Sequence, residues 1–186
     1  MTSFLLRLFD MLFAGIGLVL LSPLLLFFYW LGFFDTGSPL LHQERVGRCL
    51  RPFVLVKFRT MRLDTLQVAS HLSSRQDITP WGAVLRRTKL DELPQLWNVL
   101  LGDMSLVGPR PGLFNQHELT QARVAHGVYS ARPGITGLAQ VNGIDMSTPE
   151  LLAQTDAAML QRLNLLDYFK YIFLTIVGNG AGDKVG

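Results

Sequence analysis

Residues 86–111 read RRTKLDELPQLWNVLLGDMSLVGPRP and are the most informative stretch of this 186-residue chain. Apolar residues recur at helical spacing through LPQLWNVLL, which predicts an amphipathic helix over Glu92–Leu101. Proline is tolerated only in the first helical turn, so Pro94 fixes where this helix begins. The residue before the predicted helix, Asp91, is therefore the expected N-cap.

Two adjacent carboxylates, Asp91 and Glu92, thus stand at the start of the predicted helix, just after Arg86, Arg87 and Lys89. One interpretation is structural, because acidic residues suit the positive end of a helix and basic neighbours pair with them. The other is chemical: carboxylates bind Mg²⁺, arginines bind phosphate oxygens, and a carboxylate can attack phosphorus. These residues alone leave both interpretations open.

Upstream, residues 11–34 form a run of twenty-four residues without a charge, of which nineteen are hydrophobic. Roughly 20 apolar residues cross the hydrocarbon layer of a bilayer as a helix, so the run predicts a membrane segment. A signal peptide and a buried core helix are the alternatives. The run is longer than the roughly 7–15-residue apolar region of a signal peptide, and no small-residue cleavage site follows it.

The pair Ser22-Pro23 interrupts this segment midway, so a kink is expected there. A kinked helix can still span a membrane, while a re-entrant helix would enter and leave on one face. Periodicity does not choose between them. Basic residues dominate the sequence that follows the run, at Arg45, Arg48, Arg51, Lys57, Arg59, Arg62 and Arg75. By the positive-inside rule, residues 35–186 are expected on the cytoplasmic side.

Overall composition narrows the class of protein. The 49% hydrophobic and 17% charged residues exclude a disordered chain. The single cysteine, Cys49, excludes a disulfide-stapled secreted fold and zinc sites built on paired cysteines. Residues 35–90 carry a net charge of +6 and residues 91–186 a net charge of −3. The basic half suits anionic headgroups or a phosphorylated ligand, or is simply a solvated face, and the absence of any recognisable binding motif argues against nucleic acid.

A mixed α/β domain is predicted for residues 35–186, behind a membrane-inserted segment over residues 1–34. Two strands, Pro39–Glu44 and Phe53–Phe58, are expected to form a hairpin through a turn-rich connection. Near the C-terminus, residues 169–177 show an apolar helical stripe too short to span a membrane. This helix either closes the core or lies in the membrane interface, and its aromatic residues favour the interface.

Several motifs occur together and in order along nearly the whole chain. They are LxxLFD (Leu5–Asp10), Ser22-Pro23, KFRTM (Lys57–Met61), LRRTKLDELPQLWNVLLGDMSLVGPRP (Leu85–Pro111) and RPGITGLAQVNG (Arg132–Gly143). With these motifs the chain resembles the bacterial sugar transferases called monotopic polyprenol-phosphate phosphoglycosyl transferases. The N-terminal multi-helix extension of some relatives is not expected here, so the resemblance implies the minimal catalytic form.

This resemblance implies transfer of a sugar 1-phosphate from a nucleotide-diphosphate sugar to polyprenyl phosphate, with release of a nucleoside monophosphate. Such a reaction is the first membrane step of bacterial glycoconjugate assembly. The implied donor is a UDP-linked, N-acetylated sugar, the cofactor is Mg²⁺, and the other partners are membrane lipids. The implied location is the bacterial cytoplasmic (inner) membrane, with the catalytic domain on its cytoplasmic face and a re-entrant helix in the bilayer. The resemblance is also compatible with an oligomeric protein.

The resemblance also implies roles for individual residues. Asp91 corresponds to the nucleophile, which forms a phosphosugar–aspartyl intermediate, and Glu92 corresponds to the partner that holds Mg²⁺ with it. The other matched residues are expected at the substrates: Arg86 at a phosphate, Pro109, Arg110 and Pro111 at the nucleotide, and Lys57 and Arg59 near the phosphates at the membrane face.

Two positions depart from the family pattern. Leu50 stands where a second glycine is usual in the hairpin, and Ile144 follows QVNG where a basic residue is common. Two other classes of function also remain open: a non-catalytic membrane-anchored scaffold, in which Asp91 and Glu92 only cap a helix, and a membrane-bound phosphotransferase that uses another donor.

Overall fold

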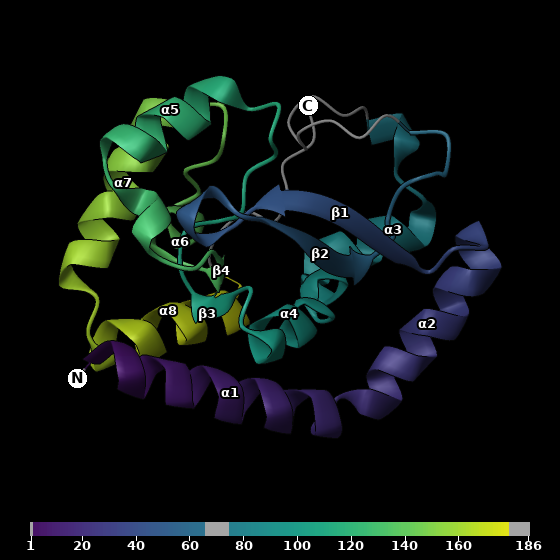
Figure 1. The fold of residues 1–186 in the computed structure, drawn as a ribbon. Helices are drawn as coiled ribbons and strands as arrows, with labels where there is room; N and C mark the ends of the chain where they lie inside the picture. Colours follow the sequence, from purple (N-terminus) through teal and green to yellow (C-terminus); the bar gives the residue numbers. More distant parts are fainter. Residues whose placement is uncertain (1, 66–74, 179–186) are drawn as a thin grey trace.

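The computed structural model describes residues 2–65 and 75–178 (Figure 1). The helices, in chain order, are α1 (Thr2–Leu20), α2 (Ser22–Thr36), α3 (Pro80–Thr88), α4 (Gln95–Leu101), α5 (His117–Ala125), α6 (Leu138–Val141), α7 (Pro149–Arg162) and α8 (Leu165–Ile176). The strands are β1 (Leu40–Val46), β2 (Pro52–Phe58), β3 (Ser105–Val107) and β4 (Gly134–Thr136). The mixed α/β class predicted from the sequence is confirmed.

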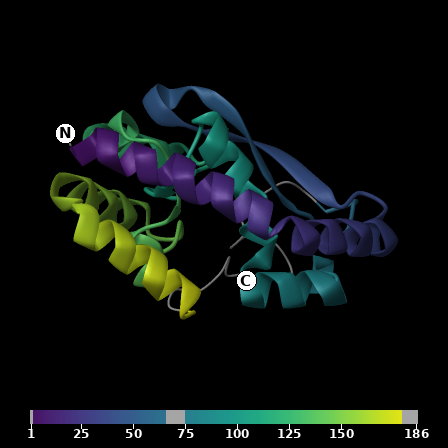
Figure 2. The ribbon, with the colours of Figure 1, turned by 90° about the horizontal axis from the view of Figure 1, so that it is seen from below.

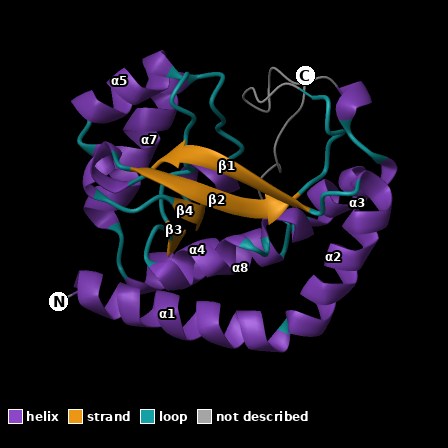
Figure 3. Cartoon of the chain, turned by 45° about the vertical axis from the view of Figure 1, so that its right-hand side comes forward, coloured by secondary structure: helices purple, strands orange, loops and turns teal. Residues whose placement is uncertain are grey.

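The strands form two small sheets surrounded by helices (Figure 3). Strands β1 and β2 pair antiparallel, in a register from Leu40 opposite Phe58 to Val46 opposite Pro52. The predicted hairpin is therefore confirmed, although its first strand continues two residues beyond the expected end. Strands β3 and β4 pair parallel, and the chain leaves β3 directly into the Pro109–Pro111 segment.

The predicted kink lies at Ser22-Pro23. Helix α1 ends at Leu20, α2 begins at Ser22, and their axes are bent by 64°. The Ser22 hydroxyl donates to the Val19 carbonyl at 2.7 Å, which satisfies one of the carbonyls at the break. Within the described residues no helix is long and apolar enough to cross a membrane by itself, whereas this bent pair passes the same test together.

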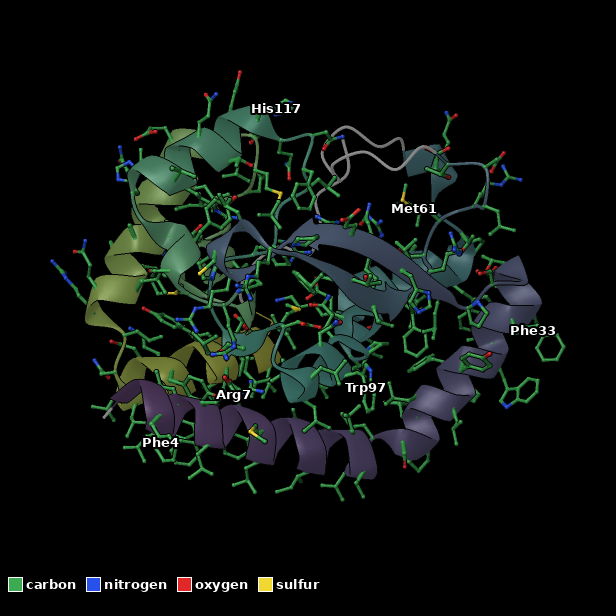
Figure 4. All side chains as sticks on the ribbon, in the orientation of Figure 1. Phe4, Arg7, Phe33, Met61, Trp97 and His117 are labelled. Atoms are coloured by element: carbon green, nitrogen blue, oxygen red, sulfur yellow. The ribbon has the colours of Figure 1, made fainter. Side chains whose placement is uncertain are left out.

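Helix α1 lies along one side of the fold, between α4 and α8 (Figure 2). Its inward residues join the core, where Ala14 is fully buried, and its outward residues are apolar and exposed. Figure 4 shows Phe4 of α1 and Phe33 of α2 pointing away from the fold, and Arg7 pointing into it. One face of the α1–α2 segment thus packs against the rest of the fold, while the other face is apolar and is not covered by any of the described residues.

Helix α8 has the first of the two roles that the sequence left open, closing the core, while a place in the membrane interface stays a prediction. Tyr168 and Tyr171 are buried in the core, while Phe173 and Ile176 on the other side are largely exposed. The helix therefore closes the core with one face. Its exposed apolar face extends the apolar side of α1, since Phe169 packs edge-on against aromatic rings of that helix.

A buried carboxylate joins α1 to the rest of the chain. Asp10 is 3% exposed, and its Oδ1 accepts hydrogen bonds from the Leu106 amide at 2.9 Å, the Tyr168 hydroxyl at 2.9 Å and the Ser105 hydroxyl at 3.1 Å. Burial and the neighbouring Asp10 charge raise the pKa of Tyr168, so the phenol stays protonated as a donor. Sequence reasoning did not predict this network.

Candidate functional site

The two carboxylates lie in a tight turn rather than at a helix N-cap. Lys89 ends α3 in the left-handed conformation, with φ 57°, and a 3₁₀ turn (η4) follows over Leu90–Glu92. The N-cap of α4 is Pro94, so the prediction that Asp91 caps a helix beginning at Glu92 is wrong. The physical reason is the reversal at Lys89, which starts a turn with i→i+3 bonds and delays the α-helix by one turn.

The turn that carries the carboxylates is enclosed by neighbouring elements. It packs against α3 and β2, and Asp91 is only 4% exposed, whereas Glu92 is half-buried. Lys57 is also buried, on the side of β2 that carries Phe53 and Leu55 into the core. The strand alternation therefore directs Lys57 toward the interior against which this turn packs.

Arg86 lies in the last turn of α3, the helix against which the carboxylate turn packs. Helix α3 lies close to the chain after β2, and Gly82 permits this approach. A Cβ at position 82 would lie 2.0 Å from the Thr60 carbonyl oxygen and would clash with it. Arg86 Nε donates to Thr60 Oγ1 at 2.8 Å, while its buried Nη1 has no hydrogen-bond partner among the described residues. An unpartnered buried donor is costly, and an anionic oxygen would satisfy it.

Arg110, in the segment after β3, contacts the carboxylate turn. Its Nη2 donates to Glu92 Oε1 at 2.8 Å, in a half-buried ion pair. Burial lowers the pKa of Lys89, the positive charge of Arg110 lowers it further, and the negative charge of Glu92 opposes both. Lys89, Glu92 and Arg110 therefore act on one another electrostatically, although Lys89 was not among the predicted site residues.

Not every predicted site residue has its side chain directed to this turn. Arg59 donates from Nε to the Ser38 carbonyl at 2.9 Å and from Nη2 to the Leu40 carbonyl at 3.4 Å. Its guanidinium thus ties down the connection between α2 and β1. Pro109 and Pro111 are buried on either side of Arg110. A substrate role for these three residues stays a prediction.

The two carboxylates of this turn suit a Mg²⁺ ion whose remaining ligands come from the substrate and water. No cluster of three or more acidic, histidine or cysteine side chains able to hold a metal occurs within residues 2–65 and 75–178. Mg²⁺ at phosphate-transfer sites is commonly held by one or two carboxylates together with substrate phosphates and water. Asp91 and Glu92 are the two carboxylates of this turn, and a magnesium site there stays a prediction.

A hollow of about 640 Å³ opens elsewhere, between the end of α2 and the start of α3. Asp35, Arg62 and Asp64 contribute to its lining, and neither Asp91 nor Glu92 does. The candidate site is therefore defined by the cluster of charged residues, not by this hollow.

A model of the family described as bacterial sugar transferase matches residues 1–179. The chain belongs to that family. The resemblance carried by the sequence motifs is thereby confirmed at family level, and the carboxylate turn, Arg86 and the Pro109–Pro111 segment all lie inside the matched region.

Individual members of the bacterial sugar transferase family show how far the similarity extends. The UDP-glucose:undecaprenyl-phosphate glucose-1-phosphate transferase of Caulobacter vibrioides is 42% identical over 159 residues, which cover 82% of this chain and 60% of the relative. The UDP-galactose-lipid carrier transferase of Erwinia amylovora is 35% identical over 94% of this chain and 40% of its own length. An uncharacterized sugar transferase of Haemophilus influenzae is 38% identical, over 76% and 34% respectively. The chain thus spans between about a third and three fifths of these relatives.

Proposed function

We propose that this chain transfers a sugar 1-phosphate from a UDP-sugar to a polyprenyl phosphate, giving a polyprenyl-diphosphate sugar and UMP. The observation that carries the proposal is the carboxylate turn, which holds the buried Asp91, packs against β2 and α3, and carries Glu92 in an ion pair with Arg110. The names of the Caulobacter and Erwinia relatives support the choice of a nucleotide-sugar donor and a lipid acceptor.

In the first step, a carboxylate oxygen of Asp91 attacks the phosphorus that carries the sugar. The bond from this phosphorus to the bridging oxygen of the diphosphate breaks, and UMP leaves with the electron pair. A sugar phosphate is then bound to Asp91 as an acyl phosphate. Asp91 suits this role because it is held in a short turn with little freedom to move.

In the second step, a phosphate oxygen of the polyprenyl phosphate attacks the same phosphorus. The bond between phosphorus and Asp91 breaks, which restores the carboxylate and forms the diphosphate link to the lipid. The two half-reactions share one site, so UMP leaves before the lipid phosphate reacts. The expected kinetics are therefore ping-pong.

Positive charge makes the meeting of several anions feasible. The donor diphosphate, the lipid phosphate and Asp91 are all anionic, and Arg86 Nη1 is a buried donor available to a phosphate oxygen. Mg²⁺ held by Glu92 and Asp91 would neutralise charge on the donor diphosphate and so stabilise the transferring phosphoryl group. Arg110 orients Glu92 for this contact through their ion pair.

The lipid acceptor requires a membrane location, and the α1–α2 pair offers one. Its exposed apolar face and 64° bend suit a re-entrant segment that enters and leaves the cytoplasmic membrane on its cytoplasmic face, with α8 in the interface. The test is to replace Cys49 by serine, place a cysteine at Thr2 and label intact cells. Protection from an impermeant reagent until lysis is expected, and ready labelling from outside would contradict the re-entrant topology.

The reaction is tested by measuring UMP release from a panel of UDP-sugars with Mg²⁺ and polyprenyl phosphate. We expect release with at least one donor and none from Asp91→Asn enzyme. A non-catalytic scaffold would release no UMP with any donor. A phosphotransferase that uses another donor would act only when the panel is extended to other nucleotides.

A further inference from the structure

The Pro109–Pro111 segment is held by its carbonyl oxygens. Prolines have no amide N–H, so two of the three residues cannot donate backbone hydrogen bonds. Each carbonyl instead accepts one: Pro109 from the Gly134 amide at 2.8 Å, Arg110 from Arg123 Nη1 at 2.7 Å and Pro111 from Arg45 Nη1 at 3.1 Å. The position of Arg110 therefore depends on a side chain of α5.

That side chain is itself held by a second buried charge. Arg123 Nε and Nη2 donate to Asp156 Oδ2 of α7 at 3.1 and 2.7 Å. The two side chains are 2% and 0% exposed. The guanidinium thus connects α7 to the backbone of Arg110, with two of its nitrogens on Asp156 and the third on the Arg110 carbonyl.

Stability alone does not account for this pair. Burial raises the pKa of Asp156, although the charge and hydrogen bonds of Arg123 oppose the shift. Asp156 Oδ1 is buried and has no hydrogen-bond partner among the described residues. A buried ion pair that is incompletely satisfied contributes little net stability compared with apolar residues of similar size.

We propose that Arg123, oriented by Asp156, is a positioning residue for the candidate active site. It fixes the backbone of Arg110, and through the Arg110–Glu92 ion pair it fixes the carboxylate that acts on the donor diphosphate. The consequence for turnover rests on the proposed function. The consequence for the order of the Pro109–Pro111 segment does not.

The main test removes both charges together, in Arg123→Met/Asp156→Leu. This variant should fold, because no unpaired ion is left in the core. The rate of the UMP burst measured without lipid should fall about 10- to 100-fold, the loss expected from a displacement of about 1 Å at the reacting groups. An unchanged burst rate in the folded variant would overturn the proposal.

A double-mutant cycle separates positioning from a general structural effect. If Arg123 acts through Arg110, then in an Arg110→Ala background the double substitution should cause little further loss. Fully additive losses would overturn the proposal. Arg123→Lys provides a second variant, because its single amine retains the charge but cannot reproduce three directed hydrogen bonds. It should fold and show the same dependence on Arg110, whereas unfolding of both variants would assign the pair to stability alone.

The matched control is a pair that connects the same two helices without touching the segment. His126, at the end of α5, contacts Glu150 of α7 at 2.8 Å on the exposed surface. The variant His126→Ala/Glu150→Ala should therefore retain the burst rate. A loss equal to that of the buried pair would show that any weakened contact between α5 and α7 slows the reaction.

Hydrogen exchange tests the positioning claim independently of activity. Amides of Gly108–Leu113 should exchange faster in Arg123→Met/Asp156→Leu than in the unaltered protein, while those of α1 should not change. If the unaltered protein releases no UMP with any donor, the proposed function fails, and this measurement still decides the present proposal. Unchanged exchange across Gly108–Leu113 would contradict it.

Discussion

Arg110 donates a hydrogen bond from Nη2 to Glu92 Oε1 at 2.8 Å, across eighteen residues of sequence. The ion pair gives two adjacent carboxylates different surroundings, because Asp91 is nearly inaccessible while Glu92 is half-buried and paired with a cation. The proposed mechanism assigns the metal to Glu92 and the attack on phosphorus to Asp91.

Replacement of Glu92 tests its proposed contact with Mg²⁺. Glu92→Gln should lower kcat by several orders of magnitude, at about 1.4 kcal/mol per tenfold, because the amide loses the charge that binds the metal. Excess chelator should abolish turnover in the unaltered enzyme, and added Mg²⁺ should restore it. Glu118→Gln, on the exposed surface of α5, serves as the control and should remain active. Full activity in excess chelator would refute the metal requirement.

Loss of the positive charge of Lys89 is expected to limit activity at alkaline pH. Burial is the main cause that lowers its pKa from the usual 10.5, so its positive charge is lost at a lower pH than that of an exposed lysine. As pH rises through this lowered pKa, the charge beside Glu92 and Arg110 disappears and kcat/KM for the donor should fall. Lys89→Arg keeps its charge, so its kcat/KM should persist to higher pH. Identical alkaline limbs in the two enzymes would exclude Lys89 as the cause.

We expect the hydrogen bonds that Asp10 accepts to contribute strongly to the stability of the fold. Asp10→Ala leaves the buried Leu106 amide and Tyr168 hydroxyl without their acceptor, so the free energy of unfolding should fall by about 3–5 kcal/mol. Tyr168→Phe should cost less, about 1–2 kcal/mol. Urea titration in detergent measures both, with exposed Asp64→Ala as the control. A change for Asp10→Ala no larger than for Asp64→Ala would show that the hydrogen bonds of Asp10 contribute no net stability.

Local patterns in the sequence predicted much of the fold. Two strand-like stretches joined by a turn-rich connection predicted the β1–β2 hairpin, and Ser22-Pro23 predicted the bend between α1 and α2. Each depends on interactions between residues close in the sequence. The adjacent carboxylates and Arg110 were found through motifs, and the structure brings Glu92 and Arg110 into contact.

Long-range contacts could not be predicted in the same way. Asp10, just before the apolar run, gave no sign of donors that lie about a hundred residues or more away, and Arg123 and Asp156 resembled ordinary charges on amphipathic helices. The N-cap assignment of Asp91 failed for a different reason. Propensity does not predict a left-handed lysine, and Lys89 adopts that conformation.

The hairpin connection carries a strain that substitution should relieve. Leu50 has φ 60°, a conformation that costs a non-glycine residue about 1–2 kcal/mol, and the family pattern usually has glycine at this position. Leu50→Gly should therefore raise the free energy of unfolding by about 1 kcal/mol. The neighbouring Arg51 has φ −75°, so Arg51→Gly is a matched control that should lower it slightly. Equal effects at both positions would show that the connection relaxes in solution.

The covalent intermediate on Asp91 tests the proposed mechanism most directly. The purified enzyme is incubated with a UDP-sugar and Mg²⁺ but without lipid, quenched, and digested for mass spectrometry. We predict a mass increase of one sugar phosphate on the peptide that contains Asp91, one UMP released per adduct, and neither product from Asp91→Asn. An Asp91→Asn enzyme with near-normal turnover, or UMP release that strictly requires the lipid phosphate, would contradict the mechanism.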